Sequence, residues 1–147
     1  MLTEKDYCDY DTCVALREVG CRIETEWYIH QPSYERGSCY LCFGIPRETS
    51  VLDECDYIPR LSLYEAQKWL REEKEVYVTV IPEYNDYCPV KGVKYRLEVA
   101  HWKDDEFGYE TIEWLDEECS HTIITFDSYE EALSEGIKEA VKILKEK

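Results

Sequence analysis

The sequence predicts an α+β fold, a single domain over residues 1–147 with three helices and a mostly antiparallel sheet of about five strands. Three observations predict this class. Helix start signals with apolar residues at helical spacing occur at three places, and β-branched or alternating segments lie between them. A chain of 147 residues can bury a sizeable core. Aromatic residues make up 14% of it, which argues against disorder. The expected order is α-β-β-α-β-β-β-(β)-α.

The first helix is expected to be short and to lie near the N-terminus. Asp11 or Thr12 can cap its start, and Gly20 suits the left-handed position that ends a helix. Its apolar side consists of Ala15, Leu16 and Val19.

A hairpin is expected next, with strands at Arg22–His30 and Cys39–Ile45 joined through Gln31–Ser38. The polar stretch Arg47–Pro59 that follows is expected to be a long loop.

The middle helix begins at the capping-box signal Ser62–Glu65. Its inner stripe consists of Leu63, Ala66, Gln67 and Leu70. Directly after this helix, Val76–Ile81 is a nearly continuous β-branched run, which predicts a central strand.

Three further strands are expected before the last helix. Gly92–Lys103 alternates in polarity, and its apolar phase ends at His101, which is therefore expected to be half-buried in the sheet. A turn at Asp104–Gly108 leads to a returning strand at Tyr109–Leu115, and Thr122–Phe126 is a short strand.

The last helix has the strongest signals in the chain. Ser128 and Glu131 form a capping box, and lysines near its end suit the helix dipole. Its apolar residues recur at helical spacing on one stripe, which consists of Tyr129, Ala132, Leu133, Gly136, Ile137, Ala140, Val141 and Leu144.

Two of these helices also carry a resemblance. The segments Leu63–Glu72 (LYEAQKWLRE) and Asp127–Leu133 (DSYEEAL), with Leu16–Cys21 (LREVGC), resemble a family of small uncharacterised proteins of gut-bacterial phages and mobile elements. In that family a QKWLRE helix precedes a strand and a YEEAL…GIKEAL helix closes the chain. The resemblance implies an accessory factor that binds a host protein, such as an inhibitor of a defence nuclease. It assigns no functional residue.

The charge of the chain excludes several functions. With 33 acidic and 17 basic residues the formal net charge is −16, which is unsuited to direct binding of nucleic acid or anionic lipid. The longest mostly apolar run, Val76–Pro82, is far shorter than a membrane span. The acidic N-terminal segment lacks the apolar core of a secretory signal, so a cytoplasmic location in the host cell is expected.

The eight cysteines are expected to be reduced, because a chain without an export signal stays in a reducing compartment. Most are expected to be structural buried thiols. A zinc site is the alternative, with Cys39 and Cys42 of the single CxxC, Cys55 and His30 as ligands. Because Cys39–Ile45 is expected to be a strand, its i and i+3 side chains would point to opposite faces, which disfavours a zinc knuckle. No other cofactor is expected.

No motif predicts catalysis. The chain lacks the P-loop, dinucleotide-binding, nucleophile-elbow and zinc-protease patterns. An enzyme with a diffuse site would draw on Cys119 and His121, or on His101, but no orienting group can be assigned to them. The sequence therefore favours a protein that is not an enzyme.

The acidic stretch Asp104–Glu118 is the strongest functional candidate. It holds eight carboxylates and no basic residue, so it contributes half of the formal net charge. One interpretation is a solvated surface that aids solubility. The other is a surface that binds a basic, nucleic-acid-handling protein and imitates nucleic acid, with aromatic anchors among the charges. The expected contact residues are Asp104, Asp105, Glu106, Phe107, Tyr109, Glu110, Glu113, Trp114, Asp116, Glu117 and Glu118.

Overall fold

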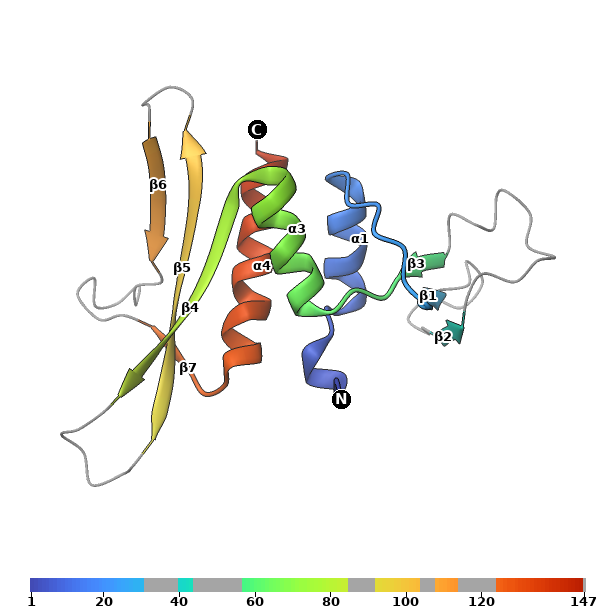
Figure 1. Ribbon diagram of the computed structural model, residues 1–147, viewed down its shortest axis with the longest axis horizontal. Coiled ribbons are helices and arrows are strands. Elements are labelled where there is room, and N and C mark those ends of the chain that lie inside the picture. The colour runs from blue at the N-terminus through green and yellow to red at the C-terminus, as the bar shows by residue number, and fades with distance from the viewer. Residues whose placement is uncertain (31–39, 44–56, 85–91, 104–107, 114–123, 147) are drawn as a thin grey trace. The chain divides into compact units, whose positions relative to one another are not determined.

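The computed structural model describes residues 1–30, 40–43, 57–84, 92–103, 108–113 and 124–146. The chain divides into two compact units, unit 1 (Met1–Ser62) and unit 2 (Leu63–Lys147), and helices and strands occur in both (Figure 1). The predicted α+β class is confirmed. The described strands form two antiparallel sheets, one in each unit, where the sequence predicted one sheet.

Unit 1 combines short helices with a three-stranded sheet. Its elements are the 3-10 helix Glu4–Asp6, α1 (Tyr10–Glu18), β1 (Trp27–His30), β2 (Tyr40–Phe43) and β3 (Tyr57–Pro59), and the strand order is β2-β1-β3. The third strand corrects the sequence prediction, which placed these residues in a loop. Ile58 lies opposite Ile29 in β1, and both side chains are buried, so apolar pairing makes a strand of this short segment.

Helix α1 is capped two or three residues earlier than predicted. Asp9 is its N-cap, and the carboxylate oxygen of Asp9 accepts a hydrogen bond of 2.8 Å from the backbone amide of Thr12. Asp9, rather than Asp11 or Thr12, therefore satisfies a free amide of the first turn. The helix ends at Glu18, and Gly20 adopts a φ of 104°, which confirms it as the left-handed residue after the helix.

Unit 2 packs two helices against a longer sheet. Its elements are α3 (Leu63–Lys74), β4 (Val76–Tyr84), β5 (Val93–Lys103), β6 (Gly108–Glu113), β7 (Thr125–Phe126) and α4 (Tyr129–Lys145). Strand β5 pairs with β4 along one edge, and with β6 and β7 along the other. The helices α3 and α4 lie on the same side of β4 and β5 (Figure 1).

Strand β4 was predicted to be central, and among the described strands it lies at the edge of its sheet. Its burial alternates, because Val76 and Val78 are buried whereas Tyr77 and Thr79 are exposed, so the β-branched run does not have two buried faces. Pro82 is compatible with an edge strand, because its missing N–H group removes no hydrogen bond to a neighbouring strand there. The β4 backbone is also engaged by α3, since the Gln67 amide donates a 2.8 Å hydrogen bond to the Val78 carbonyl.

The core of unit 2 lies between α4 and the sheet. Ser128 caps α4 by accepting a hydrogen bond from the Glu131 amide, as predicted. Leu97 and Val99 in β5 are fully buried. Gly136 allows the close approach of α4, because a Cβ there would lie 2.4 Å from Val78 Cγ1 and 2.7 Å from Leu97 Cδ1. The buried residues of α4 are Ala132, Leu133, Gly136, Ile137, Ala140, Val141 and Ile143.

Candidate functional site

The acidic hairpin, Asp104–Glu118, is partly described by the structure. Strands β5 and β6 pair in antiparallel register, which agrees with the predicted hairpin. The Cα atoms of Glu110 and Glu113 lie opposite those of His101 and Glu98, respectively. Two glutamates, Glu98 and Glu113, are therefore direct cross-strand neighbours.

The remaining contact candidates divide into two groups. Tyr109 lies opposite Trp102 in the β5–β6 register. The other eight lie outside the described residues, and these are Asp104, Asp105, Glu106, Phe107, Trp114, Asp116, Glu117 and Glu118. Their role in a binding surface stays a prediction.

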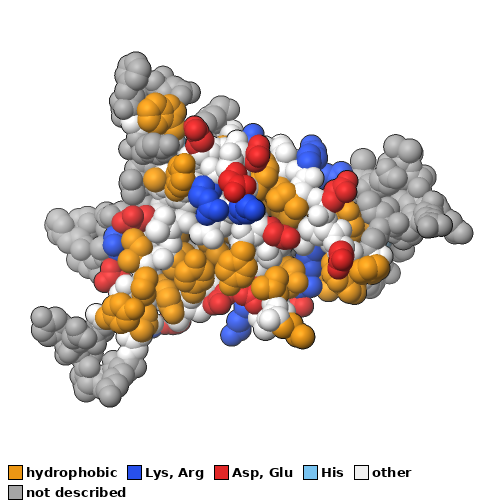
Figure 2. Space-filling view, in the orientation of Figure 1, with side chains coloured by type: hydrophobic (Ala, Val, Ile, Leu, Met, Phe, Trp, Pro, Cys, Tyr) orange, Lys and Arg blue, Asp and Glu red, His pale blue; other side chains and the backbone are white. Residues whose placement is uncertain are grey.

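Ion pairs neutralise acidic residues on both sides of β5. Arg96 lies between two of them: its Nε is 2.9 Å from Glu83 and its Nη1 is 2.7 Å from Glu98. Lys94 pairs with Asp127. On the face shown in Figure 2, basic and acidic side chains of the described residues lie mixed among hydrophobic ones. The segment Asp104–Glu118, by contrast, contains no basic residue.

Three buried thiols lie in unit 1. Cys8, Cys13 and Cys21 are free and buried, as predicted for structural thiols. The Cys13 thiol donates to the Cys8 carbonyl at 3.8 Å, and the Cys8 thiol donates to the Ser62 carbonyl at 3.9 Å. A hydrogen bond with the Cys13 thiol, together with burial, raises the pKa of the Cys8 thiol well above its ordinary range. The protonated form of Cys8 is the one that fits this site.

The predicted zinc ligands are only partly described. Cys42 lies within β2, so the second half of the CxxC forms a strand, as the sequence predicted. The imidazole of His30 stacks on the Tyr57 ring, with 4.3 Å between centroids and an interplanar angle of 12°. Cys39 and Cys55 lie outside the described residues, and within the described part of the chain no group of three metal ligands is found. The zinc alternative therefore stays a prediction, which elemental analysis of chelator-free protein tests.

His101 is more deeply buried than predicted, with 6% of its surface exposed. It lies on the apolar phase of β5 with Leu97 and Val99, which is consistent with a sheet residue of the core. The other members of the diffuse enzyme site, Cys119 and His121, lie outside the described residues.

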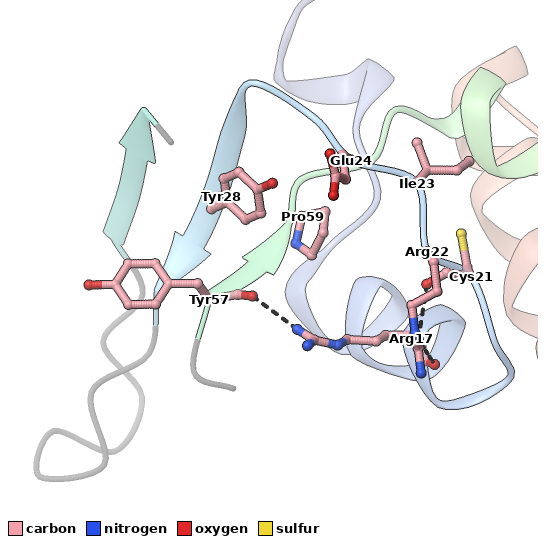
Figure 3. A pocket seen from close by; sticks show the side chains of 8 residues that line it. All are labelled: Arg17, Cys21, Arg22, Ile23, Glu24, Tyr28, Tyr57 and Pro59. Atoms are coloured by element: carbon pink, nitrogen blue, oxygen red, sulfur yellow. Dashed lines mark hydrogen bonds between the residues drawn. The ribbon is translucent and has the colours of Figure 1, made fainter. Parts of the chain in front are cut away.

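Unit 1 contains a pocket that the sequence did not predict. It has a volume of about 220 Å³ and lies between the end of α1, the segment after α1, and strands β1 and β3 (Figure 3). Arg17, from the last turn of α1, donates from Nη1 to the Tyr57 carbonyl at 3.0 Å. Arg22 donates from Nη1 to the Arg17 carbonyl at 2.6 Å. The lining residues come from separate elements, so no local motif signals the pocket.

A pair of exposed aromatic residues lies on the sheet of unit 1. Trp27 and Phe43 are cross-strand partners, and their rings meet edge to face with 5.5 Å between centroids. The exposed fraction of Trp27 is 45% and that of Phe43 is 72%. Glu24 and Glu26, just before β1, are exposed as well. The aromatic pair therefore has acidic neighbours in sequence.

Comparison with known proteins leaves the family open. No family model, curated protein or solved structure matches the chain. The resemblance to small proteins of phages and mobile elements therefore stays a prediction. Among the described residues, each helix is too short or too polar to cross a membrane.

Proposed function

We propose that this protein is a non-enzymatic accessory factor that acts by binding another protein, whose basic surface handles nucleic acid. The acidic hairpin is the proposed contact. One observation carries the proposal: β6 places glutamates along a paired strand, with Glu113 directly opposite Glu98, at the centre of a segment without any basic residue.

This arrangement is costly for a sheet. Like charges on directly opposed residues destabilise an antiparallel pair. Arg96 offsets the charge of Glu98 on the β4 side, whereas the segment containing Glu113 has no cation of its own. An acidic strand kept at a cost in stability supports a role in binding, because solubility could be met by carboxylates placed elsewhere.

The chemistry of the segment fits a basic partner. Concentrated carboxylates attract such a partner from a distance and raise the association rate, an effect that salt screens. Aromatic residues among the charges would supply the desolvated anchors that carry much of the binding energy at interfaces. The resemblance to accessory proteins of mobile elements agrees with this reading.

The proposal is tested by affinity capture with paired variants. Wild-type protein, E113Q/D116N/E117Q/E118Q and the control E26Q/E72Q/E73Q/E146Q are each immobilised and exposed to host-cell lysate at low salt. The control replaces four exposed glutamates outside the hairpin, so both variants lose the same formal charge. We expect one nucleic-acid-handling protein on the wild type and the control, released at raised salt, and a several-fold weaker band on the hairpin variant. Equal capture by all three proteins would contradict the proposal.

Whether the protein imitates nucleic acid is tested by a separate competition experiment. Once the captured protein is purified, duplex DNA is added as a competitor to the preformed complex. Displacement at DNA concentrations near the affinity of that protein for DNA supports mimicry. Simultaneous binding of DNA and this chain would show that the contact lies away from the nucleic-acid site.

A further inference from the structure

The pocket of unit 1 is a second candidate site, independent of the acidic hairpin. Its volume of about 220 Å³ is below the range of about 300–1,000 Å³ that is typical of drug-sized ligands. An occupant of this pocket is therefore about the size of an amino acid.

The cationic side of the pocket is oriented by the backbone. The bond from Arg17 Nη1 to the Tyr57 carbonyl uses one of the five N–H donors of the guanidinium and holds its position. Figure 3 shows the Tyr57 carbonyl directed at Arg17 and the Tyr57 ring directed away from it. Among the ion pairs of the described residues, none involves Arg17. Its remaining donors can therefore hold a carboxylate of a ligand.

Arg22 has a different role. Its Nη1 donates to the carbonyls of Arg17 and Cys21, at 2.6 and 3.2 Å, at the end of α1. The Arg17 carbonyl also accepts a hydrogen bond from the Gly20 amide, so the Arg22 bonds reinforce the turn that follows α1. Arg22 thus holds the segment after α1 in place and adds positive charge to the pocket without being needed as a direct contact.

The anionic side of the pocket is Glu24. This exposed residue lines the same pocket, and Figure 3 shows its carboxylate near Pro59 and Tyr28. In the part of the chain that the structure describes, no ion pair joins Glu24 to Arg17. Opposite charges in one small pocket, held apart by the fold, complement a ligand that carries both charges.

The wall of the pocket is apolar. Ile23, Tyr28 and Pro59 line it together with the charged residues. A carboxylate alone would be held by Arg17 but would leave Glu24 without a partner, and a dianionic phosphate would meet the negative charge of Glu24 beside the two guanidinium groups. An apolar amine alone would meet the positive charge of Arg17 and Arg22. The lining therefore favours a zwitterion with an apolar body.

We propose that this pocket binds a small zwitterion, a free α-amino acid with an apolar side chain. Arg17 holds the carboxylate, Glu24 holds the ammonium group, and Tyr28 and Pro59 contact the side chain.

The test is calorimetric titration of the full chain with three probes of similar shape: L-phenylalanine, 3-phenylpropionate, which lacks the ammonium group, and phenethylamine, which lacks the carboxylate. We expect saturable binding of phenylalanine, at least tenfold tighter than that of either analogue. Absence of saturable phenylalanine binding, or equal affinity for all three probes, would overturn the proposal. Inorganic phosphate that binds more tightly than phenylalanine would overturn it as well.

Variants localise the binding. E24Q should weaken phenylalanine binding at least tenfold while leaving 3-phenylpropionate unchanged or tighter, and E26Q is the matched control at an exposed glutamate outside the pocket lining. The Arg17 side chain also bonds to the backbone of β3, so R17Q is expected to disturb the fold of this region. R17K keeps the positive charge and removes the bidentate hydrogen bonding of the guanidinium to a carboxylate, so it is the variant to test. Equal effects of E24Q and E26Q would place the binding elsewhere. The hairpin residues take no part, so this result is independent of the proposed function.

Discussion

The two sheets of this protein bury their apolar faces to different extents. In unit 2 the residues of β5 that face the helices, Leu97 and Val99, are fully buried. In unit 1, Ile29 is buried, but Trp27, two residues before it on the same face of β1, remains exposed with its partner Phe43. The side of the unit 2 sheet that faces the helices is thus a packed core, whereas the unit 1 sheet leaves two large apolar side chains exposed.

Strand length explains part of this difference. Strands β4 and β5 have 9 and 11 residues, and nine residue pairs connect them, so two helices can pack along the sheet. Strands β1 and β3 have 4 and 3 residues. A sheet of this size has room for few buried residues, and its remaining apolar side chains stay at the surface.

The largest expected effect is in the core of unit 2. L133A removes a fully buried side chain from α4 and should lower the free energy of unfolding by about 2–5 kcal/mol, because the cavity cannot collapse completely. Chemical denaturation followed by far-UV circular dichroism measures the change. K142A, at an exposed position of the same helix, should change it by less than about 0.5 kcal/mol. A loss below about 1 kcal/mol for L133A would contradict the tight packing of α4.

A smaller loss is expected where α4 comes closest to the sheet. G136A places a methyl group against Val78 and Leu97, and we expect a loss of about 1–2 kcal/mol, since the gain in helix propensity offsets only part of the overlap. The same denaturation curves measure it. G92A is the control, because no atom lies within 4 Å of a Cβ at that position. A more stable G136A protein would show that the helix and sheet have room to separate.

The thiols of unit 1 predict a dependence on pH. Cys8 has a raised pKa through its hydrogen bond with Cys13, its burial and the negative charge of Asp9, so it keeps its proton in the folded state. The unfolded chain releases that proton above its ordinary pKa of 9.0. Stability should therefore fall as the pH rises above 9.0, by at most about 1.4 kcal/mol per pH unit for one proton.

Melting temperatures measured from pH 7 to pH 10.5 test this dependence. The melting temperature of C8A should decline less steeply above pH 9.0 than that of the wild type, because C8A lacks the thiol whose pKa is raised. Identical slopes for the two proteins would mean that Cys8 does not cause the decline.

The smallest expected effect is at the aromatic pair of unit 1. A double-mutant cycle with W27A and F43A should give a coupling energy of about 0.5–1 kcal/mol, as for an edge-to-face pair that remains partly exposed. Denaturation of the wild type, the two single variants and the double variant supplies the four stabilities. A coupling near zero would show that the two rings do not stabilise the sheet in solution.

Local signals predicted the helices and most strands. The cap at Ser128 and the alternation that buries Leu97 are properties of neighbouring residues, so they can be read directly from the sequence. Strand β3 could not be predicted in this way, because its pairing depends on the contact of Ile58 with Ile29, far away in the chain. The edge position of β4 is likewise decided by how the strands are arranged in space.

The candidate sites were predictable to a smaller extent. The acidic hairpin can be recognised in the sequence as a run of carboxylates. The sequence does not give the strand register, and it is the register that places Glu113 opposite Glu98. The pocket of unit 1 had no sequence signal, because Arg17, Glu24 and Pro59 meet only through the fold.

The association rate of the captured partner tests the central claim most directly. The rate is measured by stopped-flow fluorescence at a series of salt concentrations for the wild type, E113Q/D116N/E117Q/E118Q and E26Q/E72Q/E73Q/E146Q. We predict that the hairpin variant associates about tenfold more slowly at low salt and with a weaker salt dependence, whereas the control stays within about twofold of the wild type. Equal slowing of both variants would contradict the claim, because net charge rather than the hairpin would then govern binding.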